Sequence, residues 1–112
     1  MKDINKNIVI NIKNYMDIFG INQRELAKKL RCSNSTVSMW LSGNATPRME
    51  KIDKMCLIFG CNREDLISDK PKSAAEARQA QVTKTFVRKF LKLSPEDQLD
   101  LLTYMEDHYR ND

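Results

Sequence analysis

The sequence predicts an all-α protein in which a five-helix domain is followed by a two-helix hairpin. Apolar residues recur at the spacing that places them on one face of a helix. Residues that cap helices stand at the ends of these apolar segments. With only three Gly and three Pro among 112 residues, the chain has little room for long irregular loops. The polar connector 69–72 predicts a boundary between a domain at 1–69 and a helical segment at 70–112.

The first expected helix spans 4–19 and supports the rest of the domain. One apolar stripe identifies it: Ile8, Ile12, Tyr15 and Phe19. Because β-branched residues are numerous in this segment, the spacing rather than the propensity indicates a helix. Gly20 follows at the position where helices commonly stop.

Residues 22–43 are expected to form two short helices joined by a tight turn. Asn22 caps the first helix and forms a capping box with Glu25, three residues on. Ser33 is a good cap for the second helix. Spacings of three and four residues point six apolar side chains inward: Leu26, Ala27, Leu30, Val37, Trp40 and Leu41. Trp40 is therefore interpreted as a core residue rather than as a stacking aromatic.

The other face of the second short helix is polar and uncharged. It comprises Asn34, Ser35, Ser38, Met39 and Ser42. Such side chains match the donors, acceptors and thymine methyl groups that base edges present in the DNA major groove. We therefore expect this face to read DNA sequence.

Two further helices complete the expected domain. Pro47 is predicted at the first position of the fourth helix, and Gly60 ends that helix. The buried face of the fourth helix comprises Ile52, Met55, Cys56 and Phe59. Asn62 caps the fifth helix, whose apolar residues are expected to close the core: Leu66 and Ile67.

Two amphipathic helices are expected after the connector, at 73–93 and 94–112. Their apolar stripes carry the residues that we expect to mediate oligomerisation: Phe86, Phe90, Leu93, Leu99, Leu102 and Met105. Two such helices expose apolar surface unless they pack on the first domain or on another chain, and we favour another chain. Residues 71–93 carry a net charge of +5 and residues 94–112 a net charge of −5, which favours pairing of these segments.

The overall composition excludes several classes of function. The net charge is +4, and residues 1–70 contain 12 Lys and Arg against 8 Asp and Glu, as a phosphate-binding surface requires. A single His and the absence of a Gly-rich phosphate loop give no sign of an enzyme. The three Cys contain no Cys-x-x-Cys pair, so we expect reduced thiols and neither a metal nor a cofactor. No apolar run is long enough for a membrane span, and we expect a cytoplasmic protein.

Residues 21–67 resemble the helix-turn-helix domain of the Cro/lambda-repressor-like (XRE) family. The resemblance rests on four runs. Two lie in the short helices: Asn22-Gln23-x-Glu25-Leu26-Ala27 and Val37-Ser38-x-Trp40. Two lie beyond them: Phe59-Gly60-Cys61 and Asp65-Leu66-Ile67. The family usually carries Gly where Arg31 stands, because the turn there needs a positive φ, and a small apolar residue where Cys61 stands. The resemblance implies a five-helix lambda-repressor-like DNA-binding domain.

The resemblance also implies which residues contact DNA. Gln23 is expected to bond a phosphate at the amino-terminal end of its helix. Base contacts are expected from Asn34, Ser35, Ser38 and Met39. The backbone contacts are expected from residues around the ends of the recognition helix: Gln23, Ser33, Thr36, Ser42, Asn44, Thr46 and Arg48.

The predicted function is a sequence-specific, dimeric transcriptional repressor that occludes a two-fold-related operator in double-stranded DNA. The homo-oligomer is a dimer or larger, and an anti-repressor protein is a conceivable partner. One alternative is an antitoxin whose carboxy-terminal helices bind a toxin protein. Another is an interaction module whose recognition face has lost DNA binding. A neighbouring toxin gene would favour the antitoxin, and a failure to bind any DNA would favour the interaction module.

Overall fold

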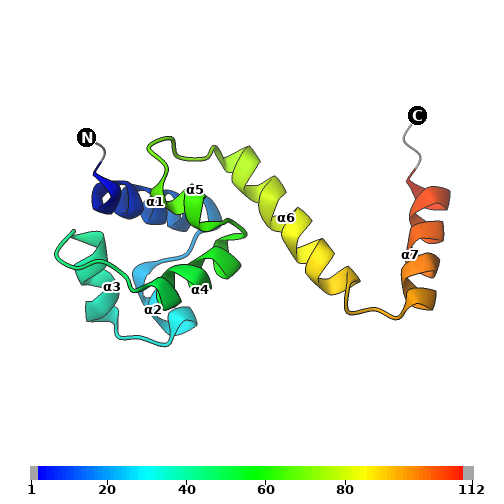
Figure 1. The fold of residues 1–112 in the computed structure, drawn as a ribbon, viewed down its shortest axis with the longest axis horizontal. Coiled ribbons are helices and arrows are strands. Elements are labelled where there is room, and N and C mark those ends of the chain that lie inside the picture. The colour runs from blue at the N-terminus through cyan, green and yellow to red at the C-terminus, as the bar shows by residue number, and fades with distance from the viewer. Residues whose placement is uncertain (1–2, 110–112) are drawn as a thin grey trace. The chain divides into compact units, whose positions relative to one another are not determined.

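The computed structural model describes residues 3–109 and confirms the all-α prediction (Figure 1). Five helices form the amino-terminal part, in agreement with the sequence: α1 Ile4–Phe19, α2 Gln23–Leu30, α3 Asn34–Leu41, α4 Met49–Phe59 and α5 Arg63–Ile67. Two further helices follow: α6 Ala74–Phe90 and α7 Pro95–His108. The described chain divides into two compact units, one ending at Gln81 and the other beginning at Val82.

The first unit extends past the boundary expected at Asp69, because the first turns of α6 pack on the five-helix domain. Ala77 is only 2% exposed. Arg78 Nη2 donates a hydrogen bond to the carbonyl of Ile18 at 3.3 Å, and Gln81 Nε2 donates to the carbonyl of Ile58 at 3.1 Å. These two carbonyls lie in the last turns of α1 and α4, where no intrahelical donor remains for them.

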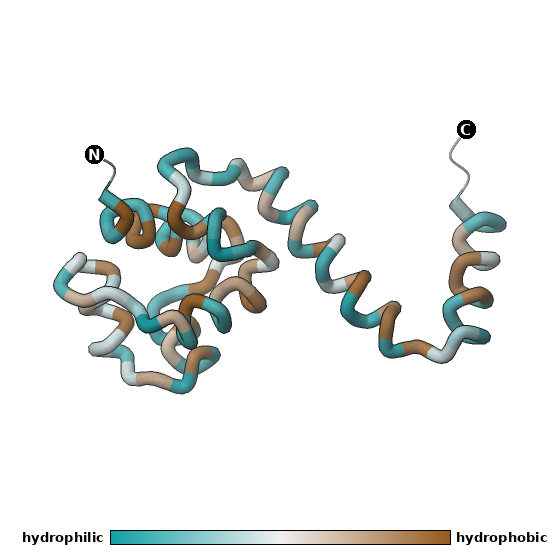
Figure 2. Tube along the Cα trace, viewed as in Figure 1, coloured by the Kyte–Doolittle hydropathy of each residue, from teal (hydrophilic) through white to brown (hydrophobic). Residues whose placement is uncertain are grey.

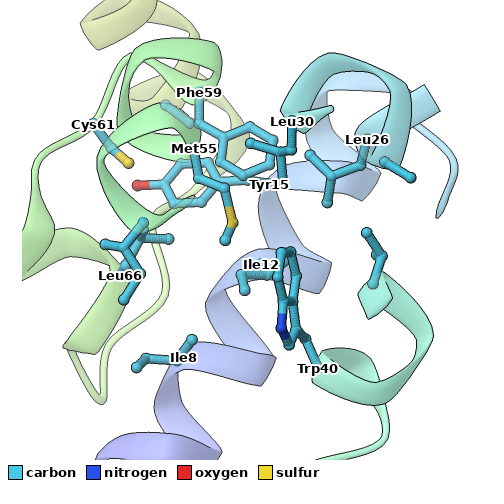
Figure 3. Close-up of a cluster of buried hydrophobic side chains, with 14 residues drawn as sticks. Ile8, Ile12, Tyr15, Leu26, Leu30, Trp40, Met55, Phe59, Cys61 and Leu66 are labelled. Carbon is cyan, nitrogen blue, oxygen red and sulfur yellow. The ribbon is translucent and has the colours of Figure 1, made fainter. Parts of the chain in front are cut away.

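The core lies between α1, α2, α3, α4 and α5 and contains the apolar side chains that the spacing predicted (Figure 3). The rings of Tyr15 and Phe59 stack with their centroids 5.1 Å apart. Trp40 is 5% exposed and belongs to the core, as expected. The prediction for Ile67 is wrong, since this residue is 41% exposed. Neighbouring helix positions point about 100° apart, so the core position of α5 is taken by Leu66 alone.

Four helices end in the same motif, in which one residue adopts a left-handed conformation. These residues are Gly20, Arg31, Gly43 and Gly60, with φ between 56° and 82°. After each one, the next backbone N–H bonds the carbonyl five residues back, as in a Schellman motif. The stops expected at Gly20 and Gly60 are confirmed, and Arg31 does adopt the positive φ (56°) of a position usually held by Gly.

Side chains from distant helices satisfy other carbonyl groups at helix ends. Asn11 is 1% exposed, and its Nδ2 donates to the carbonyls of Leu66 and Ser68, both at 2.8 Å. Lys51 Nζ donates to the carbonyl of Leu30 at 2.7 Å, at the end of α2. These bonds hold α5 on α1 and α4 on α2, because a buried carbonyl without a donor would cost free energy.

The start of α4 differs from the prediction. Pro47 is not in the helix but is buried in the preceding loop, and α4 begins at Met49. Arg48 is the N-cap residue, with an extended backbone at φ −70° and ψ 157° and no hydrogen bond from its side chain to the helix. Its carbonyl accepts the first helical bonds, from the N–H groups of Lys51 and Ile52.

The second unit contains the end of α6 and the whole of α7. Ser94 caps α7 by accepting a bond from the N–H of Asp97 at 3.1 Å, and Pro95 is the first helical residue, as predicted. Figure 2 shows apolar residues recurring along both helices. Most are exposed, and α7 contains no buried residue. Between residues 3 and 109, none of the helices has the length and apolar character needed to cross a bilayer.

Gly60 and Gly20 provide a matched test of α6 packing. Gly20 has φ 63° and open space where a Cβ would stand, whereas a Cβ at Gly60 would lie 2.5 Å from the Cα of Gln81. Gly20→Ala should cost about 1 kcal/mol through backbone strain alone. Gly60→Ala should cost a further ~1–3 kcal/mol, because α6 has to shift. Urea unfolding of both variants measures the difference in the free energy of unfolding. An equal loss of stability in the two variants would show that α6 does not pack closely against Gly60.

Candidate nucleic-acid interface

The helix pair α2 and α3 is held by local caps and by shared core residues. Asn22 accepts the N–H of Glu25 at 2.8 Å, and the Glu25 carboxylate accepts the N–H of Asn22 at 3.2 Å. The predicted capping box is therefore present. Behind the pair, Leu26 and Val37 are fully buried, so that the opposite sides of both helices face outward.

Ser33 organises the first turn of α3. Its Oγ accepts the N–H of Thr36 at 3.1 Å and shares hydrogen bonds with Thr36 Oγ1 at 2.7 Å and Ser35 Oγ at 3.1 Å. Ser33 and Ser35 are exposed, and Thr36 is half-buried. Three of the predicted contact residues are thus joined in one hydroxyl cluster at the amino-terminal end of α3, where the helix dipole favours negative groups such as phosphate.

Gln23 and Asn34 are joined directly across the two helices. Gln23 Nε2 donates to the backbone carbonyl of Asn34 at 3.2 Å and to its Oδ1 at 3.1 Å. Sequence reasoning assigned these residues separately, to phosphate and to a base, and did not anticipate this contact. The bond fixes the orientation of the Asn34 amide before any ligand is present, which lowers the entropy lost on binding.

The middle of α3 presents the expected polar face. Ser38 and Met39 are exposed, Met39 to 48%, while Val37 before them and Trp40 after them are buried. Met39 is therefore not a core residue. The exposed face carries hydroxyl and thioether groups without charge, and its contacts with DNA bases stay predictions.

The loop after α3 brings together the next predicted residues. Ser42 Oγ donates to the carbonyl of Met39 at 3.0 Å, and Asn44 Nδ2 donates to Ser42 Oγ at 3.0 Å. The N–H of Asn44 also bonds the carbonyl of Met39 at 2.9 Å. These bonds shape the loop, while Thr46 and Arg48 are exposed beyond it.

Exposed basic side chains occur on the segments before and after α3 in the sequence. Arg24, Lys28, Lys29 and Arg31 of α2 and its turn are all exposed, as is Arg48 before α4. Arg31 occupies the left-handed position between α2 and α3 and therefore adds a positive charge directly beside the start of α3. A polar, uncharged helix face with basic residues on the neighbouring segments is a composition that suits binding to a polyanion such as DNA.

Comparison with known proteins agrees with this geometry. Residues 12–66 match the sequence model of the family described as Helix-turn-helix. No curated protein and no solved structure matches the chain. The matched segment contains α2, α3 and the exposed face of α3. Residues 12–66 therefore form a helix-turn-helix domain of the Cro/lambda-repressor-like (XRE) family, whose members are regulators that bind DNA and control transcription.

Proposed function

We propose that the protein is a cytoplasmic, dimeric repressor that binds a two-fold-related operator and blocks transcription by occupying it. The observation that carries the proposal is the exposed polar face of α3, held in place by the Ser33 cap and by the bond between Gln23 and Asn34. Occlusion of a promoter requires only tight binding, which this domain is equipped to provide. Base contacts are assigned to Asn34, Ser35, Ser38 and Met39.

The proposed backbone contacts follow from the same geometry. Gln23 and Ser33 lie at the amino-terminal ends of α2 and α3, where unpaired N–H groups attract phosphate. Thr36 Oγ1 is hydrogen-bonded to Ser33 Oγ. The remaining proposed backbone contacts come from the loop after α3: Ser42, Asn44, Thr46 and Arg48. These contacts would fix the register of α3 on the duplex without reading its sequence.

A dimer is proposed because a single domain would bind only one half-site. The apolar residues predicted for oligomerisation remain accessible in the single chain: Phe86, Leu93, Leu99 and Leu102 are between 37% and 65% exposed. Burying them against a second copy would remove apolar surface from water. Two half-sites about 34 Å apart, one turn of the double helix, would then be read together.

DNA affinity should fall steeply with salt, because Lys and Arg release counterions from the duplex. If about six phosphates are neutralised, affinity should fall roughly 10³-fold between 50 and 200 mM salt. Binding sites selected from random duplex DNA supply the operator, and fluorescence anisotropy over a salt series gives the slope. A flat response would argue against a phosphate-bound complex and for an interaction module without DNA binding.

The bond between Gln23 and Asn34 should appear as coupling in a double-mutant cycle. Gln23→Ala and Asn34→Ala should be non-additive in operator binding, by about 0.5–3 kcal/mol, because each residue orients the other. Gln23→Ala and Ser38→Ala form the matched control and should add within roughly 0.5 kcal/mol. Ser38→Ala alone should change the preference at one base pair by about 1–3 kcal/mol. Equal coupling in both cycles would contradict the role assigned to Gln23.

Leu102→Glu should separate dimerisation from DNA binding. The carboxylate is placed within the exposed apolar stripe of α7 and should raise the dimer dissociation constant at least tenfold, which corresponds to about 1.4 kcal/mol. Thr103→Glu adds the same charge at the next exposed position and should leave the dimer intact. Sedimentation and operator titration measure both variants.

Truncation after Gln81 completes this test, because it keeps the packed start of α6 and removes the second unit. We expect a folded monomer whose operator affinity is at least tenfold weaker. A truncated protein that still dimerises and binds equally well would instead favour the alternative, an antitoxin whose carboxy-terminal helices bind a toxin.

A further inference from the structure

Two cysteines occupy the ends of the Schellman motif that terminates α4. The N–H of Cys61 donates to the carbonyl of Cys56 at 3.0 Å, around the left-handed Gly60. In this motif, the side chains of the two bonded residues commonly touch. Here both bonded residues are cysteines, and the Cys61 thiol is hydrogen-bonded to the side chain of Cys56.

The same motif at two other helix ends shows what is particular to α4. At the end of α1 the bonded pair is Met16 and Ile21, and at the end of α2 it is Ala27 and Cys32. Neither pair contains two groups that can form a covalent bond with each other. Cys32 therefore has no thiol across its own motif, which makes it an internal control for the reactivity of the α4 pair.

Burial and hydrogen bonding divide the two α4 thiols into different roles. Cys61 is 5% exposed, and Figure 3 shows its sulfur beside the hydroxyl of Tyr15 in the core. Two effects raise the pKa of the Cys61 thiol far above its usual range: mainly its hydrogen bond with Cys56, and also its burial. This thiol therefore stays protonated. Cys56 is only partly buried and is therefore the more exposed of the two residues.

We propose that Cys56 and Cys61 form a redox modification site, in which hydrogen peroxide converts the two thiols to an intramolecular disulfide. The Cys56 thiolate attacks one peroxide oxygen, the O–O bond breaks, and the departing hydroxide takes a proton to become water. Cys56 is then a sulfenic acid. The sulfur of Cys61 attacks the Cys56 sulfur, the S–O bond breaks, and the Cys61 proton leaves with the hydroxide as a second water. Two thiols are oxidised, and one peroxide is reduced to two waters.

This assignment gives each cysteine a specific task. Cys56 meets the oxidant because it is the more accessible thiol, and Cys61 resolves the sulfenic acid because it is held against it. Burial shields Cys61 from the oxidant, since only 5% of this residue is exposed. In a reducing compartment, such a disulfide would be transient and would report oxidation.

The experiment uses the full chain with Cys32→Ser, which removes the third thiol. The protein is treated with a few equivalents of hydrogen peroxide, alkylated and digested with trypsin. Residues 55–63 lie between Lys54 and the bond after Arg63, so both cysteines fall in one tryptic peptide. We expect this peptide to lose the mass of two hydrogens, to resist alkylation, and to recover both thiols on treatment with dithiothreitol.

Single variants assign the two roles. With Cys61→Ser, the sulfenic acid of Cys56 should persist and be trapped by dimedone, and with Cys56→Ser, Cys61 should remain a thiol. In protein that retains Cys32, oxidation of Cys32 shows that the peroxide treatment worked. If the 55–63 peptide were unchanged in that sample, the proposal would be overturned. Sulfinic or sulfonic acid at Cys56 without loss of hydrogens would also overturn it, because it would show that Cys61 does not reach the oxidised sulfur.

Discussion

The domain depends on ending short helices at single left-handed residues. Its helices up to α5 contain between 5 and 16 residues, so a large share of their backbone groups lie at helix ends without an intrahelical partner. The chain turns at four such residues: Gly20, Arg31, Gly43 and Gly60. The N–H of the residue that follows each one donates a hydrogen bond to the carbonyl five residues before it. Arg31 is the costly case, because a side chain in this conformation is strained by about 1 kcal/mol. Its turn joins α2 to α3 and so helps to position the face of α3 that we propose reads DNA.

Helix caps, which involve residues close together in the sequence, could be predicted from the sequence. Hydrogen bonds between residues far apart in the sequence could not. Asn22, Ser33 and Asn62 cap helices through residues three positions away, so the pattern itself identifies them. Asn11 bonds a carbonyl 55 residues away and Lys51 one 21 residues away. Nothing in their local sequence distinguishes them from surface residues. The packed start of α6 was not predicted for the same reason, since tertiary neighbours alone bury Ala77 and partly bury Gln81.

The candidate site likewise contains one feature that the sequence predicts and others that depend on tertiary packing. The exposed face of α3 follows from its buried face: once Val37 and Trp40 point inward, Ser38 and Met39 have to point outward. The bond from Gln23 to Asn34 depends instead on how α2 crosses α3, which spacing along one helix does not specify. The start of α4 at Met49 likewise depends on the burial of Pro47 in the loop rather than on the helix preference of Pro.

The thiol pair shows how a folding motif acquires chemistry without a change of backbone. In a Schellman motif, the two residues joined by the five-residue hydrogen bond commonly make an apolar side-chain contact. Cysteine packs as a small hydrophobic residue, so Cys56 and Cys61 can make this contact. Where Ala27 and Cys32 meet, only one sulfur is present and the contact is inert. Two cysteines in the same geometry add a reaction, because the motif that ends α4 also sets the approach of one sulfur to the other.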